Sequence, residues 1–402
     1  MFGGHAVLVV PRAYARLNHR PQILPIYLPA ALLGVPAQAS FVLLPLYVLE
    51  LGGSVAAASA VVGLRGLGMM AMDIPAGMAA ARIGDKATML VACLVMTLCY
   101  GAFALSDDVA WFYPIAFLYG AGGSTFLLGR MSFITAAIGP GERGRVIAMI
   151  AGGLRMSALI GPLDGGAIAT RYGFGSAFVC AGICAALATV AIGIFCPAPE
   201  RSSQPLAWHS LPALGWRHRA SFSTAGVTAV TFMLMRSART VLLPLLGAGL
   251  GLDAAAVGFV VSVSAAIDVA FFYPAGVWMD RYGRRATAVP SAIAFMLVLA
   301  AMSLVDSYTW LIMVAVAAGI ANGLSTGIVM TLGTDLAPAA ERGEFLGLWR
   351  LMTDFGTASG PIVVSAVVAV APLSSAALVV SGLSALGVLV VVFGLRETLP
   401  QA

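Results

Sequence analysis

Several charged side chains lie inside segments that are otherwise apolar, and they are the groups of this chain that could do chemistry. Arg236 and Arg239 lie three residues apart and therefore share one face of a helix. Asp164 is the acid that we expect near them, so at least one of the two arginines lacks an obvious counter-charge. The pair could bind an anionic group of a solute, or Asp164 and backbone carbonyls could neutralise it as scaffold. We expect Arg236, Arg239 and Gln38 to bind substrate.

Aspartates in the same segments are the groups that could carry a proton. They are Asp73, Asp164, Asp268, Asp354 and, near a helix end, Asp335. The pKa of an ordinary aspartate is about 3.9, so a carboxylate that exchanges protons near neutral pH needs surroundings that favour its neutral form. We expect Asp164 to carry the proton because its arginines are distant, and Asp268 is the second candidate. A purely structural Asp164 is the alternative.

These charged groups need helices that hold them within a membrane. Hydrophobic residues make up 60% and charged residues 10% of the 402 residues, which excludes a soluble globular chain. A segment of about 20 apolar residues can cross a bilayer. Each charge inside such a segment costs at least about 2.5–3.5 kcal/mol and needs a partner or a water-filled cavity. The sequence predicts twelve spans, at roughly 22–47, 55–80, 88–105, 110–138, 146–170, 175–197, 221–247, 254–279, 287–304, 309–337, 345–371 and 375–395.

Basic residues indicate how the spans are oriented. On the side opposite the N-terminus, Arg171 is accompanied by Asp107, Asp108, Asp253 and Asp306. The other basic residues outside the spans fall on the side of the N-terminus, namely Arg12, Arg16, Arg20, Arg82, Lys86, Arg143, Arg145, Arg201, Arg217, Arg219, Arg281, Arg284, Arg285, Arg342 and Arg396. By the positive-inside rule we expect both termini in the cytoplasm and the protein in the cytoplasmic (inner) membrane. This asymmetry also explains the pI of about 9.1 without a nucleic-acid partner.

The chain repeats itself with an offset of 199 residues. Gly276–Arg285, Gly-Val-Trp-Met-Asp-Arg-Tyr-Gly-Arg-Arg, recurs in altered form as Gly77–Lys86. Duplicated membrane halves are typical of carriers. The Gly276–Arg285 segment resembles the signature loop of the major facilitator superfamily, which joins helices 2 and 3 and again helices 8 and 9. The first copy departs from the pattern, because Ala81 replaces the acidic residue and Asp85 replaces a basic one.

The resemblance implies an all-α membrane protein with twelve transmembrane helices in two pseudo-symmetric six-helix bundles around a central cavity. The bundles would be residues 1–197 and 221–402, joined by a cytoplasmic linker at 198–220. In this fold helix 7, which carries Arg236 and Arg239, lines the cavity.

Packing of helix 5 on helix 8 and of helix 2 on helix 11, as in the family, would create ion pairs between the halves. At matching depths it pairs Arg155 with Asp268 and Asp73 with Arg350, whereas Arg65 and Asp354 match less well. Such pairs could gate transport or merely hold helices together. Arg130 should extend to the cytoplasmic interface, and a role in the cavity is the alternative.

The signature loop is the other expected gate. Asp280 should meet the positive N-terminal end of helix 5, and the loop arginines should bridge locally. In the first half the signs are swapped, so Arg82 and Lys86 should face Glu341 and Glu344. The complete set of expected gating residues is Asp73, Arg155, Arg350, Asp354, Gly276, Asp280, Arg281, Gly283, Arg284, Arg285, Gly161 and Pro162.

The segment Gly161–Gly166, Gly-Pro-Leu-Asp-Gly-Gly, resembles an element of the antiporter branches of the superfamily. It favours a secondary active transporter that exports small organic molecules in exchange for protons by alternating access. The alternatives are uptake or exchange of an anionic organic solute read by the arginines, a generic packing role for Gly161–Gly166, and a non-transporting sensor or scaffold. We expect no enzyme activity, no cofactor and no bound metal, and a monomer as the working unit.

Overall fold

The structure, a computed structural model, describes residues 23–197 and 211–398. Arg12, Arg16, Arg20, Arg201 and most of the expected linker, at 198–210, lie outside the described residues. The rest of that linker contains two short helices, α8 (Leu211–Arg217) and α9 (Arg219–Ser221).

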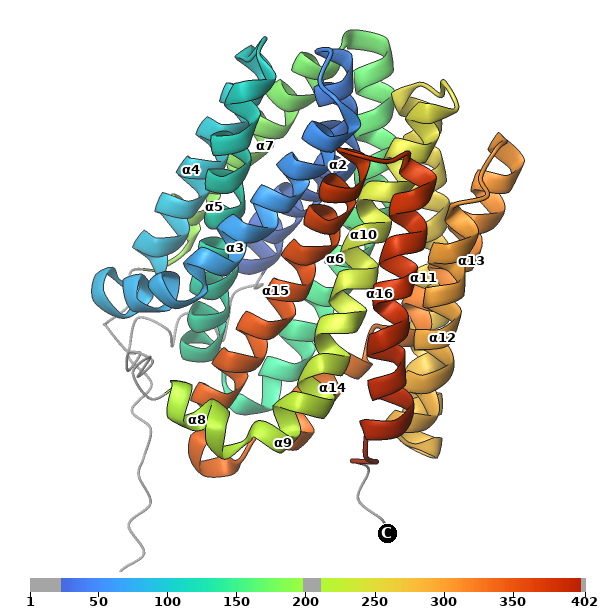
Figure 1. The fold of residues 1–402 in the computed structure, drawn as a ribbon. Helices are drawn as coiled ribbons and strands as arrows, with labels where there is room; N and C mark the ends of the chain where they lie inside the picture. The colour runs from blue at the N-terminus through green and yellow to red at the C-terminus, as the bar shows by residue number, and fades with distance from the viewer. Residues whose placement is uncertain (1–22, 198–210, 399–402) are drawn as a thin grey trace, which may run out of the picture.

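Long helices account for nearly all of the described chain (Figure 1). The first half consists of the π-helical turn η2 (Ile23–Tyr27) followed by α2 (Leu28–Glu50), α3 (Val55–Ile83), α4 (Asp85–Leu105), α5 (Val109–Ala137), α6 (Pro140–Tyr172) and α7 (Phe174–Phe195). The second half consists of the π-helical turn η4 (Phe222–Gly226) followed by α10 (Val227–Gly249), α11 (Ala254–Tyr282), α12 (Arg284–Met302), α13 (Tyr308–Ser325), α14 (Ile328–Leu336), the 3₁₀ turn η5 (Ala339–Glu341), α15 (Arg342–Val368) and α16 (Leu373–Gly394).

Eleven helical stretches in the described part of the chain are long and apolar enough to cross a membrane. One of them combines α13 and α14, which are separated only by Thr326 and Gly327. The remaining long helix, α5, has 29 residues and is also long enough to span, but its glycines and tyrosines make it less apolar. It packs against α3 and α4 inside the first half. The twelve predicted spans therefore correspond to eleven apolar stretches and α5.

The two halves repeat the same packing. Within the first half α3 packs on α5, α2 on α6 and α4 on α7, and the equivalent pairs of the second half are α11 with α13, α10 with α15 and α12 with α16. The backbone repeats as well, since Gly52 and Gly251 have φ of 80° and 75°, and Gly84 and Gly283 have φ of 86° and 100°. These values favour glycine because a side chain is strained there. Both glycine pairs are separated by the 199-residue offset, which confirms the duplicated fold.

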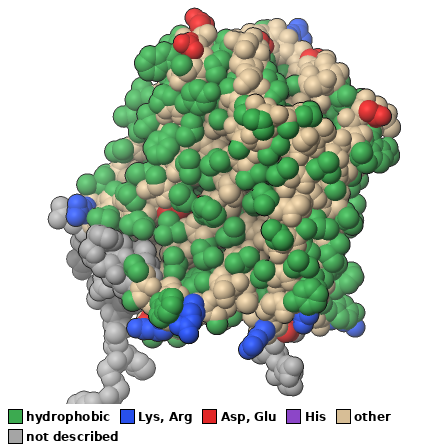
Figure 2. Space-filling view, viewed as in Figure 1, with side chains coloured by type: hydrophobic (Ala, Val, Ile, Leu, Met, Phe, Trp, Pro, Cys, Tyr) green, Lys and Arg blue, Asp and Glu red, His purple; other side chains and the backbone are tan. Residues whose placement is uncertain are grey.

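Charge distinguishes the two ends of the molecule. Figure 2 shows most of the visible lysine and arginine side chains at the lower end of the view, where α16 ends, and most of the visible carboxylates at the upper end. We call these the basic end and the acidic end. The loop between α11 and α12 lies at the basic end, and the loop between α10 and α11, with Asp253, lies at the acidic end.

Contacts between the halves are closest toward the acidic end. As expected, α3 packs on α15 and α6 on α11. A Cβ added at Gly66 would lie 2.8 Å from the Cα of Ala358, and Gly258 packs directly on the backbone of Pro162. Near the basic end, a Cβ at Gly144, Gly152 or Gly276 would meet open space. The space between the halves is therefore closed at the acidic end and opens toward the basic end.

Candidate functional site

A small cavity lies where α2 and α6 of the first half meet α10 and α11 of the second. Its volume is about 50 Å³. Gln38 and Phe41 come from α2, and Arg239 comes from α10. Ala158 and Pro162 contribute the wall from α6. The cavity thus brings together two of the three expected substrate residues, from opposite halves.

Arg236 and Arg239 each donate a hydrogen bond to a serine. Nη2 of Arg236 donates to Oγ of Ser325 at 2.8 Å, and Nη1 of Arg239 donates to Oγ of Ser264 at 3.0 Å. The Nε atoms of both arginines are buried and find no hydrogen-bond partner among the described residues. Each guanidinium group therefore has a buried donor without a partner, which is the condition for binding an acceptor-rich solute.

Asp268 supplies the negative charge of this region. Its carboxylate acts electrostatically on Arg236, Arg239 and Arg155. Its Oδ1 accepts a hydrogen bond from Thr326 Oγ1 at 3.3 Å, at the break between α13 and α14. One carboxylate is thus the shared counter-charge of three arginines, and the site has a net positive charge.

The predicted ion pair between Arg155 and Asp268 is not formed. Among the described residues no nitrogen of Arg155 lies within 4 Å of this carboxylate, although the two charges interact over a longer distance. The guanidinium lies 3.5 Å above the ring centre of Phe272 instead. Because Asp268 is shared with two buried arginines, the aromatic face is an alternative partner for the third cation.

Asp164 does not lie where the sequence interpretation placed it. Its side chain is exposed, and among the described residues it has neither an ion pair nor a hydrogen bond. Pro162, two residues earlier, lines the cavity, so Asp164 points about 200° away from it around the helix. The expectation that Asp164 faces the cavity and neutralises Arg236 and Arg239 is wrong.

Two further arginines lie in the first half. Arg65 lies 3.9 Å above the ring centre of Phe41, which itself lines the small cavity, and its Nη1 is buried without a partner among the described residues. Arg130 lines a second cavity of about 360 Å³ with Tyr27 and Leu154. Its Nε is buried without a partner among the described residues, but the residue as a whole is partly exposed, so the extension of Arg130 to the interface stays a prediction.

Asp73 and Arg350 form the predicted ion pair between the halves. Nε of Arg350 on α15 lies 2.9 Å from Oδ1 of Asp73 on α3 and 3.6 Å from Oδ2 of Asp354. Ser124 of α5, which sequence reasoning missed, donates to Asp73 at 2.7 Å and accepts from Nη2 of Arg350 at 3.1 Å. Its small hydroxyl carried no signal in the sequence.

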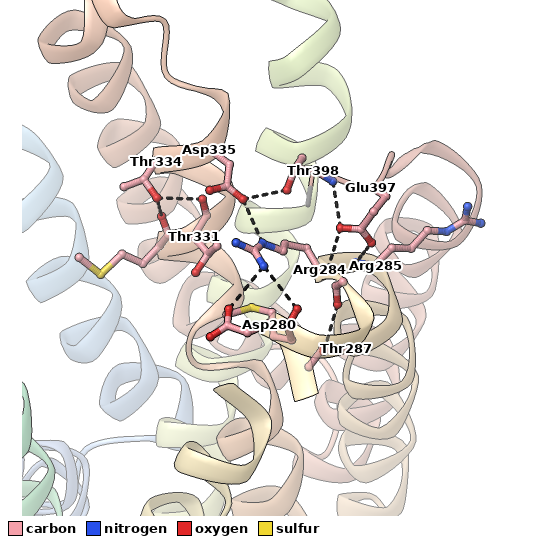
Figure 3. A network of polar contacts seen from close by, with 12 residues as sticks. Asp280, Arg284, Arg285, Thr287, Thr331, Thr334, Asp335, Glu397 and Thr398 are labelled. Carbon is pink, nitrogen blue, oxygen red and sulfur yellow. Dashed lines mark hydrogen bonds and ion pairs between the residues drawn. The ribbon is translucent and has the colours of Figure 1, made fainter. Parts of the chain in front are cut away.

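The signature loop forms a network with the end of the chain rather than with α6. Figure 3 shows Arg284 between Asp280 and Asp335, at 3.4 Å and 3.0 Å. Glu397 accepts hydrogen bonds from the backbone N–H groups of Arg284 and Arg285, at 2.8 Å and 3.0 Å. The carboxylate thereby caps the first turn of α12.

The expected contact of Asp280 with helix 5 is absent from this conformation. The Asp280 side chain is 75% exposed, and a Cβ added at Gly144 of α6 or Gly276 of α11 would meet no atom within 4 Å. In the first half, Lys86 donates to the carbonyl of Gly193 at 2.8 Å, and Glu341 binds Arg217 and His218 instead of Arg82 or Lys86. Glu341 already pairs with Arg217 of α8 and with the neighbouring His218, so the predicted pairs with Arg82 and Lys86 are wrong here.

Comparisons with known proteins agree with this architecture. A family model described as the Major Facilitator Superfamily matches residues 26–224 and 224–402. The chain is 26% identical over 343 residues to the multidrug resistance protein MdtH of Klebsiella pneumoniae, and 26% identical over 330 residues to that of Yersinia pestis, with 80% of each chain covered in both cases.

Solved structures share the fold at low sequence identity. A point mutant of the nucleoside transporter NupG superposes with a TM-score of 0.77 at 15% identity, covering 94% of this chain and 100% of that one. A point mutant of a peptide transporter POT, in complex with alafosfalin, gives a TM-score of 0.75 at 13% identity, covering 93% and 94%.

Proposed function

The chain belongs to the major facilitator superfamily, and from this premise we propose that it exports small organic molecules in exchange for protons by alternating access. It is an integral multi-pass membrane protein and a secondary transporter. The observation that carries the proposal is the small cavity between the halves, which has Gln38 and Arg239 in its wall and lies beneath a closed acidic end. A site enclosed by two similar halves can be exposed to one side at a time by rocking them.

The orientation follows from the positive-inside rule. With the basic end in the cytoplasm, both termini are cytoplasmic and the conformation described here opens inward. Arg281, Arg285 and Arg396 are exposed at that end, in agreement with this orientation. An exporter loads its substrate from the cytoplasm in such a state. We expect it to work as a monomer in the cytoplasmic membrane.

Two observations support export rather than uptake. The relatives from Klebsiella pneumoniae and Yersinia pestis are multidrug resistance proteins. The segment Gly161–Gly166 also packs at the boundary between the halves, since Gly166 packs on the backbone of Ala254 in the second half, while Gly161 packs on Ala39 of its own half. Small residues let these backbones approach closely, so a rocking motion changes the contacts of this segment directly.

A second candidate is the uptake or exchange of an anionic organic solute. It is favoured by the excess of buried cations, because Arg155, Arg236 and Arg239 share one carboxylate, and Arg65 adds a further positive charge beside Phe41. Carboxylates and phosphates suit the planar fork of arginine. The substrate class thus distinguishes the two candidates.

Transport into proteoliposomes with an imposed pH gradient tests both. Purified protein is supplied with a panel of cationic, neutral and anionic solutes. Export by proton exchange predicts that at least one solute moves against the direction of the proton. Movement of anions with the proton would favour the second candidate, and transport that is unaffected by collapse of the gradient would contradict proton coupling.

A further inference from the structure

The strongest unassigned feature is the polar cluster that connects α3 and α5 of one half with α15 of the other. It consists of Asp73, Ser124, Arg350 and Asp354. The side chains of Asp73 and Asp354 are only 3% and 15% exposed, and that of Arg350 is 25% exposed. Ser124 is 0% exposed, so the cluster forms a largely dehydrated contact between the halves.

The charges of this cluster do not balance. Two carboxyl groups face one guanidinium, so the cluster carries one net negative charge when both are ionised. Oδ2 of Asp73 and Oδ2 of Asp354 are buried and have no hydrogen-bond partner among the described residues. Both carboxyl groups contact the same nitrogen, Nε of Arg350, at 2.9 Å and 3.6 Å, so they lie close to each other. Two ionised carboxylates can only accept, so this contact becomes a hydrogen bond when one of them carries a proton.

Within the described part of the chain, Arg350 is the cation that pairs with these two carboxylates. Lys86 of α4 and Arg217 of α8 bind Gly193 and Glu341 instead. Arg65 of α3 stacks on Phe41, and Arg130 of α5 lies over the ring of Phe126. Arg236 and Arg239 of α10, which packs on α15, bind serines elsewhere and share Asp268. α16 contains no charged residue. A proton is thus the simplest species that neutralises the cluster.

We propose that Asp73 and Asp354 together bind one proton and that this proton is the coupling ion. The inference rests on the proposed proton-coupled transport. Binding converts one carboxylate into a carboxylic acid that donates to the other, while Arg350 neutralises the remaining charge. Loss of the proton leaves a buried net charge, which favours conformations in which α3 and α15 separate and water reaches the carboxylates. Protonation and rocking of the halves are thereby linked.

Infrared difference spectroscopy of the full-length protein in liposomes tests proton binding without knowledge of the substrate. The wild type should show a carbonyl band of a protonated carboxyl that disappears as the pH rises. Asp354→Asn should remove this band, because an amide replaces the acid while its NH₂ group still donates to Asp73. The exposed Asp164→Asn is the matched control and should keep it. Persistence of the band in Asp354→Asn, or its absence from the wild type, would overturn the proposal.

Transport measurements separate this proposal from the proposed function. For a solute moved by the wild type, Asp354→Asn should lose at least tenfold in pH-gradient-driven transport and keep solute exchange within about twofold, because exchange needs no net proton release. Full gradient-driven transport in Asp354→Asn would contradict the coupling role. A pH-sensitive band that depends on Asp354, together with no proton-driven transport of any solute by the wild type, would contradict coupled export while the proton site stands. Asp73→Asn, which also preserves shape, provides a second variant if Asp354→Asn does not fold.

Discussion

Arg350 of α15 reaches across the boundary between the two halves and places its Nε 2.9 Å from Oδ1 of Asp73 on α3. The contact is buried, since the Asp73 side chain is 3% exposed. It is the closest ion pair between the halves in the described structure, and Ser124 bonds to both partners. Buried pairs of this kind respond strongly to the loss of one partner, which makes the interaction measurable.

A double-mutant cycle should detect this pair. Arg350→Ala leaves Asp73 buried without its cation and should lower the free energy of unfolding by about 3–5 kcal/mol. Combined with Asp73→Ala, the coupling energy should fall in the range of about 0.5–3 kcal/mol. Unfolding in mixed detergent micelles gives these values. Additive effects of the two substitutions would show that the contact contributes nothing to stability.

The same cycle applied to Arg155 and Asp268 should give a much smaller coupling energy. Their charges are more than 4 Å apart, and Asp268 is shared with Arg236 and Arg239. We expect less than about 0.5 kcal/mol, the range of weakly interacting positions. A coupling as large as that of Asp73 and Arg350 would mean that Arg155 leaves Phe272 and pairs with Asp268 in the dominant conformation.

The sequence predicted the helices and their packing better than the contacts between side chains. The helices, the duplication and the packing of α3 on α15 follow from long apolar runs and from a repeat that preserves spacing. The ion pair of Asp73 with Arg350 was also predictable, because the two residues lie at the same depth of helices that pack together. Depth and helix pairing are properties that a linear sequence retains.

Direction around a helix was harder to predict. Asp164 lies at a suitable depth, but it points away from the cavity that Pro162 lines, and only the packing of α6 on α2 and α11 decides this. The partners of Arg236 and Arg239 are serines, whose frequent occurrence in spans gives no signal. The contact of Asp280 with helix 5 depends on which end of the transporter is closed, and one sequence serves both conformations.

Removal of the charge of Asp268 should change the preference of the site for anions. Asp268→Asn keeps the shape of the side chain but leaves Arg155, Arg236 and Arg239 without their shared carboxylate. Binding of an anionic solute from the panel should tighten by about tenfold, which is about 1.4 kcal/mol. Isothermal titration calorimetry measures the change, and a neutral solute is the control. Unchanged binding of every anion would show that these arginines do not contact substrate.

The two arginines of α10 should act on substrate rather than on stability alone. Arg239→Ala should weaken binding of an anionic solute by at least about tenfold, or about 1.4 kcal/mol, because Arg239 lines the cavity with Gln38. Arg239→Lys retains the charge but loses the planar fork, so it should recover only part of the affinity. If the variant with both Arg236→Ala and Arg239→Ala transported every solute as the wild type does, the two arginines would have a structural role only.

The cap that Glu397 places on α12 should contribute modestly to stability. Glu397→Gln keeps an acceptor but removes the negative charge near the N-terminal end of the helix, which should cost about 0.3–1 kcal/mol. Gly283→Ala should cost more, because the loop glycine has φ of 100° and an added Cβ would meet the Glu397 carboxylate. Thermal unfolding of the purified variants shows which of the two substitutions lowers stability more. A Gly283→Ala variant as stable as the wild type would show that the segment near Glu397 moves away readily.

Accessibility to thiol reagents tests the orientation and the open side of the transporter together. The five native cysteines are free thiols and are replaced first. Arg396→Cys, exposed at the basic end, should react only with reagent supplied from the cytoplasm, and Asp306→Cys, exposed at the acidic end, only from outside. Gly144→Cys should also react from the cytoplasm, because its side chain would enter the open space near the basic end.

Ser262→Cys reports on the closed end in the same experiment. Ser262 is 2% exposed and donates to the carbonyl of Leu159 at 2.7 Å, where α11 packs on α6. It should be protected in this conformation, and it should become reactive from outside when a transported solute or a pH gradient drives the halves to rock. Labelling of Arg396→Cys from outside would overturn the orientation. Rapid labelling of Ser262→Cys in the resting protein, with Gly144→Cys protected, would mean that the resting transporter opens toward the acidic end instead.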